Sequence, residues 1–130
     1  MTRVQQLEEF EELFAKLRLA NQAMPVLVEG ARDEAALRQF GLMGTVLLLN
    51  RGDTLVTLCD RLARSHRQLV LLTDWDDKGR VLERRLRQCL EAGGVRVDGT
   101  FWRNLQRLCG GVCRTVEGLP AFRALLEEGD

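Results

Sequence analysis

The chain has 130 residues, enough for one domain with a single hydrophobic core. Its nineteen basic and nineteen acidic residues give a formal net charge of zero, so overall charge draws it neither to nucleic acid nor to a membrane surface. The apolar runs are far shorter than the roughly 20 residues that span a bilayer, and residues 1–13 lack the basic-then-apolar layout of a signal peptide, so we expect a cytoplasmic protein with no membrane contact.

The order of apolar runs predicts that helices and strands alternate along the chain. An N-terminal helix is expected at about 4–20, where apolar side chains recur at helical spacing. Short apolar runs bounded by turn residues predict strands at 24–28, 45–49, 69–73 and 95–97. Helices are expected at about 33–41, 55–64 and 79–92, with two more in a tail at about 100–128.

This alternation is typical of an α/β fold. It predicts a Rossmann-like, four-stranded parallel sheet flanked by helices on both faces. The core of the fold would span about residues 24–98, with the N-terminal helix before it and the short helical tail after it. Since no repeat, low-complexity tract or linker interrupts the pattern, residues 1–130 are interpreted as a single domain.

Two of the apolar runs end abruptly in carboxylates. Glu29 and Gly30 follow the first predicted strand, and Asp74 and Asp76 follow the third. Because the carboxyl ends of parallel strands meet at one edge of a sheet, Glu29, Asp74 and Asp76 should lie together if these two strands are neighbours. Three converging carboxylates repel each other unless a cation lies among them, and Mg²⁺ is the usual hard cation for such oxygen ligands.

Smaller and basic residues surround these acids. Gly30 and Gly79 would leave room for a phosphate to approach the backbone. Gly79 also opens a predicted helix, whose N-terminus favours an anion, and Lys78 and Arg80 lie on either side of it. These residues are therefore candidates to support a phosphate group near the acids.

Each acidic feature also has a purely structural explanation. An Asp-x-Asp pair such as Asp74 and Asp76 often marks a solvated turn. Asp33 is better explained as a residue that caps or supports its helix than as a metal ligand. Asp77 is a third candidate ligand, although a solvated loop position explains it better. Trp75 should point away from the two aspartates and pack beneath the site.

The two motifs together resemble the signature of the Toprim domain. The matching residues are Glu29-Gly30 with Asp33, and Asp74-x-Asp76 with Gly79. Topoisomerases, bacterial primases, recombination mediators, overcoming-lysogenization-type nucleases and ribonucleases that mature ribosomal RNA share this domain. The spacing and the neighbouring residues look closest to the small stand-alone Toprim proteins of prokaryotes, and the resemblance covers about residues 24–98.

The resemblance implies an assignment of roles. Glu29 would be a general acid or base and would also face the metal, and Asp74 and Asp76 would coordinate Mg²⁺, for which Mn²⁺ can substitute. Asp77 departs from the family pattern, since such proteins often carry a basic residue there. The chain contains no tyrosine, so it cannot form the phosphotyrosine of a topoisomerase, and 130 residues leave no room for the further domains of a primase. Hydrolysis of a phosphodiester is the catalytic role that remains.

The distribution of charge is compatible with a nucleic-acid substrate. Between residues 61 and 114 there are twelve basic and six acidic residues. Arg80, Arg84 and Arg51 are predicted to contact backbone phosphates of RNA or DNA, although exposed arginines also occur on any solvated helix face. The sequence does not choose between RNA and DNA, or between a monomer and a homodimer.

Three functions are consistent with these motifs. The first is a magnesium-dependent nuclease acting on structured RNA or DNA. The second is a non-catalytic Toprim module that binds nucleic acid or a protein of repair or RNA processing. The third is a haloacid-dehalogenase-type phosphatase with Asp74 as nucleophile, because residues 71–76 match part of that motif. The late position of the motif and the upstream Glu29 disfavour this third alternative.

Overall fold

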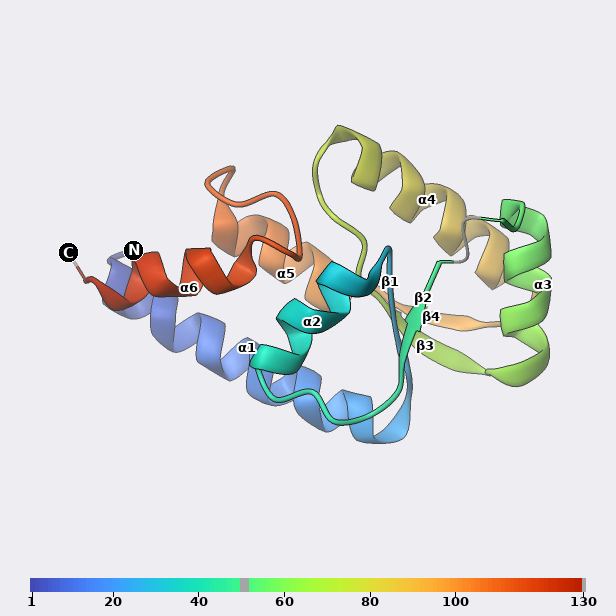
Figure 1. Cartoon of the computed structure of the whole chain (residues 1–130), viewed down its shortest axis with the longest axis horizontal. Coiled ribbons are helices and arrows are strands. Elements are labelled where there is room, and N and C mark those ends of the chain that lie inside the picture. The colour runs from blue at the N-terminus through green and yellow to red at the C-terminus, as the bar shows by residue number, and fades with distance from the viewer. Residues whose placement is uncertain (50–51, 130) are drawn as a thin grey trace.

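The computed structural model describes residues 1–49 and 52–129. The helices in this part are α1 (Arg3–Ala23), α2 (Ala31–Gln39), α3 (Leu55–Ser65), α4 (Asp77–Ala92), α5 (Thr100–Cys109) and α6 (Leu119–Glu127). The strands are β1 (Val26–Val28), β2 (Val46–Leu48), β3 (Gln68–Leu71) and β4 (Arg96–Asp98). They form one parallel sheet in the order β2-β1-β3-β4, with helices on both faces (Figure 1). The predicted α/β fold is therefore confirmed.

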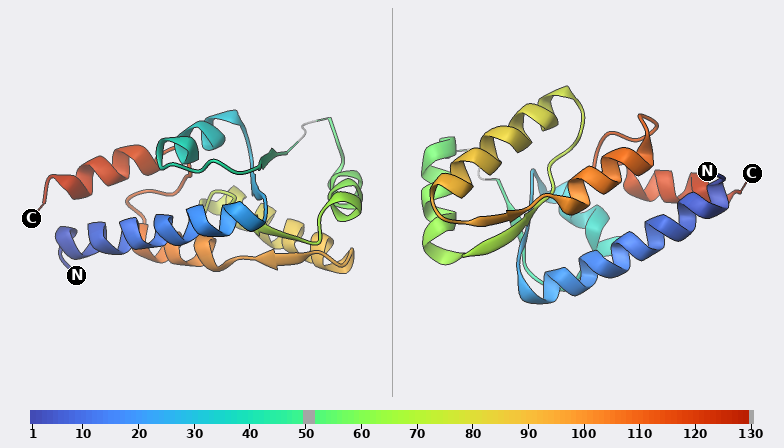
Figure 2. Two further views of the ribbon diagram at one scale, coloured as in Figure 1. Left: turned by 90° about the horizontal axis from the view of Figure 1, so that it is seen from below. Right: turned by 180° about the vertical axis from the view of Figure 1, so that it is seen from behind.

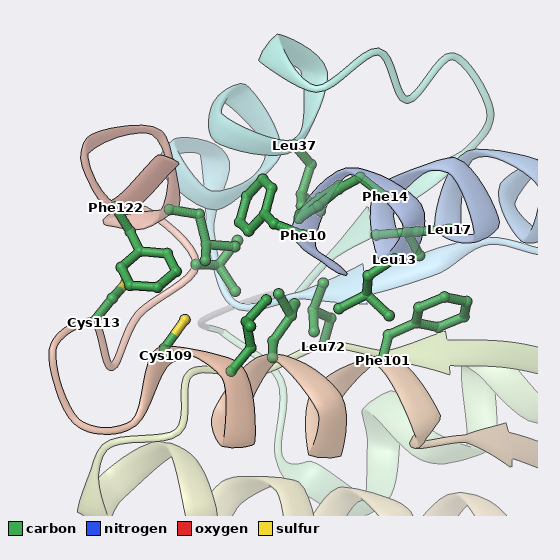
Figure 3. Packing of buried hydrophobic residues seen from close by; sticks show 14 of the residues in the cluster. Phe10, Leu13, Phe14, Leu17, Leu37, Leu72, Phe101, Cys109, Cys113 and Phe122 are labelled. Atoms are coloured by element: carbon green, nitrogen blue, oxygen red, sulfur yellow. The ribbon is translucent and has the colours of Figure 1, made fainter. Parts of the chain in front are cut away.

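The central strands β1 and β3 are buried on both faces, which explains why their sequences are continuously apolar. Their side chains alternate between two clusters. Leu27 and Leu71 face the cluster that includes α3 and α4. Val28 and Val70 face the larger cluster, shown in Figure 3, to which α1, α2, α5 and α6 contribute. Because β1 and β3 pair directly, the residues that follow them emerge side by side.

The N-terminal helix and the tail form one helical layer. Helix α1 packs against α5 and α6, and it is also tied to them by ion pairs between Glu9 and Arg107 and between Glu11 and Arg123. Both views of Figure 2 place the chain termini at the end of the molecule away from α3. Within the described residues, no helix combines the length and the apolar character needed to cross a membrane.

Two helices begin earlier than the sequence pattern indicated. Helix α2 begins at Ala31, so Asp33 lies in its first turn, where its carboxylate accepts a hydrogen bond from the Gly30 N–H (3.0 Å). Helix α4 begins at Asp77, immediately after Asp76. Strand β3 ends at Leu71, so strand geometry does not continue through the two aspartates. Both early starts follow from carboxylates that satisfy the otherwise unpaired N–H groups of a first helical turn.

Candidate functional site

The two predicted motifs meet at the carboxyl ends of β1 and β3. Glu29 directly follows β1, and its Oε2 accepts a hydrogen bond from the backbone N–H of Asp74 (2.8 Å). This bond joins residues 45 positions apart, and it is possible because the two strands are hydrogen-bonded neighbours. The structure therefore brings Glu29 and Asp74 together, as the sequence predicted.

Asp76 has a structural role that the motif alone did not indicate. It is the N-cap of α4, with extended backbone angles, and its Oδ1 accepts a hydrogen bond from the Gly79 N–H (2.7 Å). An aspartate is among the best residues for this position. The second aspartate of the motif thus fixes the start of the helix that leaves the site.

The segment between α5 and α6 holds the loop that carries the aspartates. The Val116 N–H donates to Asp74 Oδ1 (2.8 Å), and the backbone N–H of Trp75 donates to the Arg114 carbonyl (2.9 Å). The Trp75 indole N–H donates to the Cys113 carbonyl (2.6 Å). Trp75 is only 2% exposed, so it packs beneath the site as predicted. This function of the tail could not be predicted from the sequence, because the contacts join residues about forty positions apart.

Each of the three acids keeps one carboxylate oxygen available. Glu29 uses Oε2, Asp74 uses Oδ1 and Asp76 uses Oδ1 in the backbone hydrogen bonds described above. Among the described residues, no hydrogen bond is made to the second oxygen of any of them. Their orientation is thus fixed by one oxygen while the other remains open to a ligand.

The electrostatic environment of Asp74 is unfavourable for a bare carboxylate. Burial, partly offset by the hydrogen bond from Val116 and reinforced by the negative charges of Glu29, Asp33 and Asp76, raises the pKa of Asp74 to about 7. Burial likewise raises the pKa of Asp33. Such a cluster of acids is relieved either by a proton or by a bound cation.

An open cavity of about 870 Å³ lies in front of Glu29 and Asp74. Its polar lining is mainly acidic, with Asp33, Asp53 and Glu117, and contains one basic residue, Arg32. The other wall is apolar and is formed by Leu49, Leu55, Leu58 and Leu82. Glu29 and Asp74 therefore border a space large enough for a substrate, next to an apolar surface, whereas the third predicted acid, Asp76, is not among the residues that line it.

The donor set fits Mg²⁺ in its chemistry. In the part of the chain that the structure describes, no three His, Cys, Asp or Glu side chains lie close enough to form a ready-made metal cage. Mg²⁺ does not require one, since it usually keeps several waters and binds through one or two carboxylates. The open oxygens of Glu29, Asp74 and Asp76 are hard donors of the type it prefers.

The remaining predicted site residues have different surroundings. Asp77 and Lys78 are exposed in the first turn of α4. Arg80 donates from Nε to the Trp75 carbonyl (3.1 Å) and lines a second hollow rather than the acidic cavity. Arg84 is exposed on α4 and lines neither of these hollows. Arg51 lies outside the described residues.

The motif glycines differ in what surrounds them. A Cβ at Gly79 would overlap with the backbone of Asp74, whereas a Cβ at Gly30 would find its nearest neighbour, an Asp33 oxygen, at 4.0 Å. Gly79 thus allows the Asp74 loop to lie against α4. The space beside Gly79 that the sequence suggested for a phosphate is filled by the protein's own backbone.

We expect Gly79→Ala to destabilise the protein by about 1–3 kcal/mol, because the added methyl group must push the Asp74 backbone away. Gly30→Ala is the matched control. It places the same group in open space, and losing a glycine N-cap should cost less than about 1 kcal/mol. Denaturant unfolding of both variants checks this difference, and equal destabilisation would contradict it.

Comparison with known proteins gives related sequences and one related structure. No protein-family model matches the chain. A UPF0292 protein from Thermoplasma volcanium is 34% identical over 84% of this chain and 90% of its own length. UPF0292 proteins from Thermococcus onnurineus and Methanocaldococcus jannaschii are 36% and 28% identical, over 80% and 95% of their own lengths. A solved structure of a protein from Aquifex aeolicus is 27% identical and superposes with a TM-score of 0.68, covering 82% of this chain and 94% of that one.

Proposed function

The chain belongs to the UPF0292 family, and we propose that it is a Toprim-type, magnesium-dependent nuclease that hydrolyses phosphodiester bonds in structured RNA or DNA. The observation that carries this proposal is the way in which Glu29, Asp74 and Asp76 are hydrogen-bonded. Each is held by a backbone hydrogen bond through one oxygen and makes no hydrogen bond through the other within the described residues, and two of them, Glu29 and Asp74, border a substrate-sized cavity. The resemblance of both motifs to the Toprim signature supports the same function.

In the proposed reaction Glu29 moves the proton. Its Oε2 is held by the Asp74 N–H, which leaves Oε1 to accept a proton from an attacking water. The water oxygen forms a bond to phosphorus, the bond from phosphorus to the ester oxygen breaks, and the proton passes to that leaving oxygen. Mg²⁺, held by Asp74 and Asp76 with Glu29 beside it, would supply the positive charge that offsets the charge developing on the phosphate oxygens.

The protein's own groups prepare this site before the substrate arrives. The N–H groups of Val116 and Gly79 fix the orientation of Asp74 and Asp76, so these carboxylates need little reorganisation. The leucine side chains that line the cavity limit the access of water to that part of it.

We expect the wild-type protein to cleave at least one member of a panel of structured RNA, single-stranded DNA, duplex DNA and nicked DNA in the presence of Mg²⁺ or Mn²⁺. An excess of chelator should abolish cleavage, and added Mg²⁺ should restore it. Gel analysis of end-labelled substrates checks this prediction. Binding without cleavage in either metal would favour a non-catalytic module, and phosphate release from a small phosphomonoester would favour a phosphatase.

A further inference from the structure

A second hollow borders the loop that carries the aspartates. We call it the arginine hollow, and it has a volume of about 600 Å³. Its lining residues are Trp75, Arg80, Arg103, Gln106, Arg107, Gly110, Gly111 and Arg114. Asp74 lines the acidic cavity and the next residue, Trp75, lines the arginine hollow, so the loop is a wall shared by the two spaces.

Most of the positive charge around the arginine hollow is not paired with a carboxylate in the part of the chain that the structure describes. Four guanidinium groups line it, and none of its lining residues is acidic. Arg107 pairs with Glu9. Within the described residues, Arg80, Arg103 and Arg114 have no carboxylate within ion-pair distance. By contrast, Arg123 on the neighbouring α6 pairs with both Glu11 and Glu127. Like charges gathered around a hollow repel each other, and a bound anion removes that cost.

The walls of the arginine hollow are anchored to the aspartate loop. Arg80 donates to the Trp75 carbonyl (3.1 Å), and the Arg114 carbonyl accepts from the Trp75 N–H (2.9 Å). Gly110 and Gly111 have φ angles of 53° and 91°, which glycine adopts readily, and they form a turn with no side chain to fill the space. The Arg80 guanidinium and the backbone of Arg114 are therefore held against the residue between the two aspartates, which keeps this side of the hollow close to the acids.

The side chains that line the arginine hollow favour contacts with the phosphates of a ligand. Guanidinium groups present paired donors that match phosphate oxygens. Trp75 is 2% exposed and its indole N–H is bonded to Cys113, so the hollow offers no aromatic face on which a base could stack. A ligand would thus be held through phosphates, with little dependence on base sequence.

We propose that the arginine hollow binds backbone phosphates of a nucleic acid that flank the phosphate at the acidic cavity. This inference rests on the proposed nuclease function, and it identifies the part of the chain that holds the substrate. Because the acidic cavity repels phosphate when no metal is present, the arginine hollow should be the main anchor under those conditions. Binding in chelator therefore tests the hollow separately from catalysis.

The test is binding of fluorescently labelled single-stranded RNA, single-stranded DNA and duplex DNA, measured by anisotropy in excess chelator over a range of salt concentrations. We expect the double variant Arg103→Gln/Arg114→Gln to bind roughly tenfold more weakly than wild type or worse. The slope of log affinity against log salt should fall by about 1.4 on single strands or about 1.8 on duplex DNA. The preferred labelled strand identifies RNA or DNA as the substrate.

The matched control is Arg64→Gln/Arg85→Gln. It also removes two exposed arginines, on α3 and α4, that form no ion pair with any residue of the described ranges 1–49 and 52–129, but neither lines the arginine hollow. This control should bind like wild type. The variant Arg103→Lys/Arg114→Lys keeps both charges, so it should have the salt slope of wild type but only part of its affinity. Thermal melts show that all variants are folded.

Three results would overturn the inference. They are a wild type that binds no nucleic acid, an equal loss of affinity in the glutamine variant and its control, and binding of inorganic phosphate as tight as that of the oligonucleotide. Cleavage is not part of this measurement. Arginine-dependent binding without cleavage would contradict only the nuclease, whereas cleavage with arginine-independent binding would contradict only the hollow.

Discussion

Glu29→Gln should lower metal-dependent cleavage by about 10²–10⁴-fold while leaving the fold intact, because it removes the group proposed to move the proton. Glutamine has nearly the same shape as glutamate, and its side-chain carbonyl can still accept the hydrogen bond from the Asp74 N–H. The loop that carries the aspartates should therefore keep its position. Single-turnover cleavage at saturating Mg²⁺ measures the effect on the chemical step.

Glu117→Gln is the matched control for this prediction. Glu117 lines the same acidic cavity and its side chain pairs with Arg32 (3.7 Å), but within the described residues it forms no hydrogen bond or ion pair with residues 74–76. It removes the same unit of negative charge, so a general electrostatic effect would change both variants alike. The proposed role of Glu29 requires that Glu117→Gln retains most of its activity, and comparable losses in both variants would contradict it.

The elements nearest to the site were the most predictable part of the fold. The continuous apolar sequences of β1 and β3 required burial on both faces, and such burial needs helices on both sides of a parallel sheet. Their adjacency brings Glu29 next to Asp74. The burial of both strands could be predicted from the local apolar pattern, whereas their pairing was only a condition of the sequence prediction and is established by the structure.

The sequence did not predict what holds the acids in place. The bonds from Val116 to Asp74 and from Trp75 to Cys113 join a sheet loop to the tail, and no periodicity records such contacts. The N-cap role of Asp76 could in principle have been predicted, since aspartate is a common N-cap residue. Its side chain accepts a hydrogen bond from the N–H three residues later, here that of Gly79. This role was hidden because the same residue also fits a metal motif.

The position of Asp74 suits it to bind a cation but destabilises the folded protein when no cation is bound. A carboxylate that is partly buried among three others is a cost to the folded state, and the hydrogen bond from Val116 offsets only part of it. Proteins tolerate such a cost where a ligand later removes it. The same residue should therefore have opposite effects on the metal-free and metal-bound proteins.

Asp74→Asn should make the metal-free protein more stable than wild type at pH 8, by about 1 kcal/mol or more, because it removes the charge and can keep the hydrogen bond from Val116. The pKa of Asp74 is raised to about 7 in the folded protein, so the folded state holds this proton more tightly than the unfolded state does. The contribution of Asp74 to stability is thus complete below about pH 4 and is lost as the pH rises through about 7. The advantage of Asp74→Asn should consequently be larger at pH 8 than at pH 5.

Added Mg²⁺ should reverse this order. Wild type gains about 2.7 kcal/mol at a metal concentration one hundred times the dissociation constant, whereas Asp74→Asn, which lacks the charged oxygen, should gain little. Urea unfolding at pH 5 and pH 8, with Mg²⁺ and with chelator, measures the free energy of unfolding of wild type and of Asp74→Asn under each condition. If Asp74→Asn is less stable than wild type in chelator at pH 8, the buried charge of Asp74 does not destabilise the folded protein and this prediction is wrong. If Mg²⁺ stabilises both proteins equally, the metal does not bind at these acids, and the proposed chemistry loses its basis.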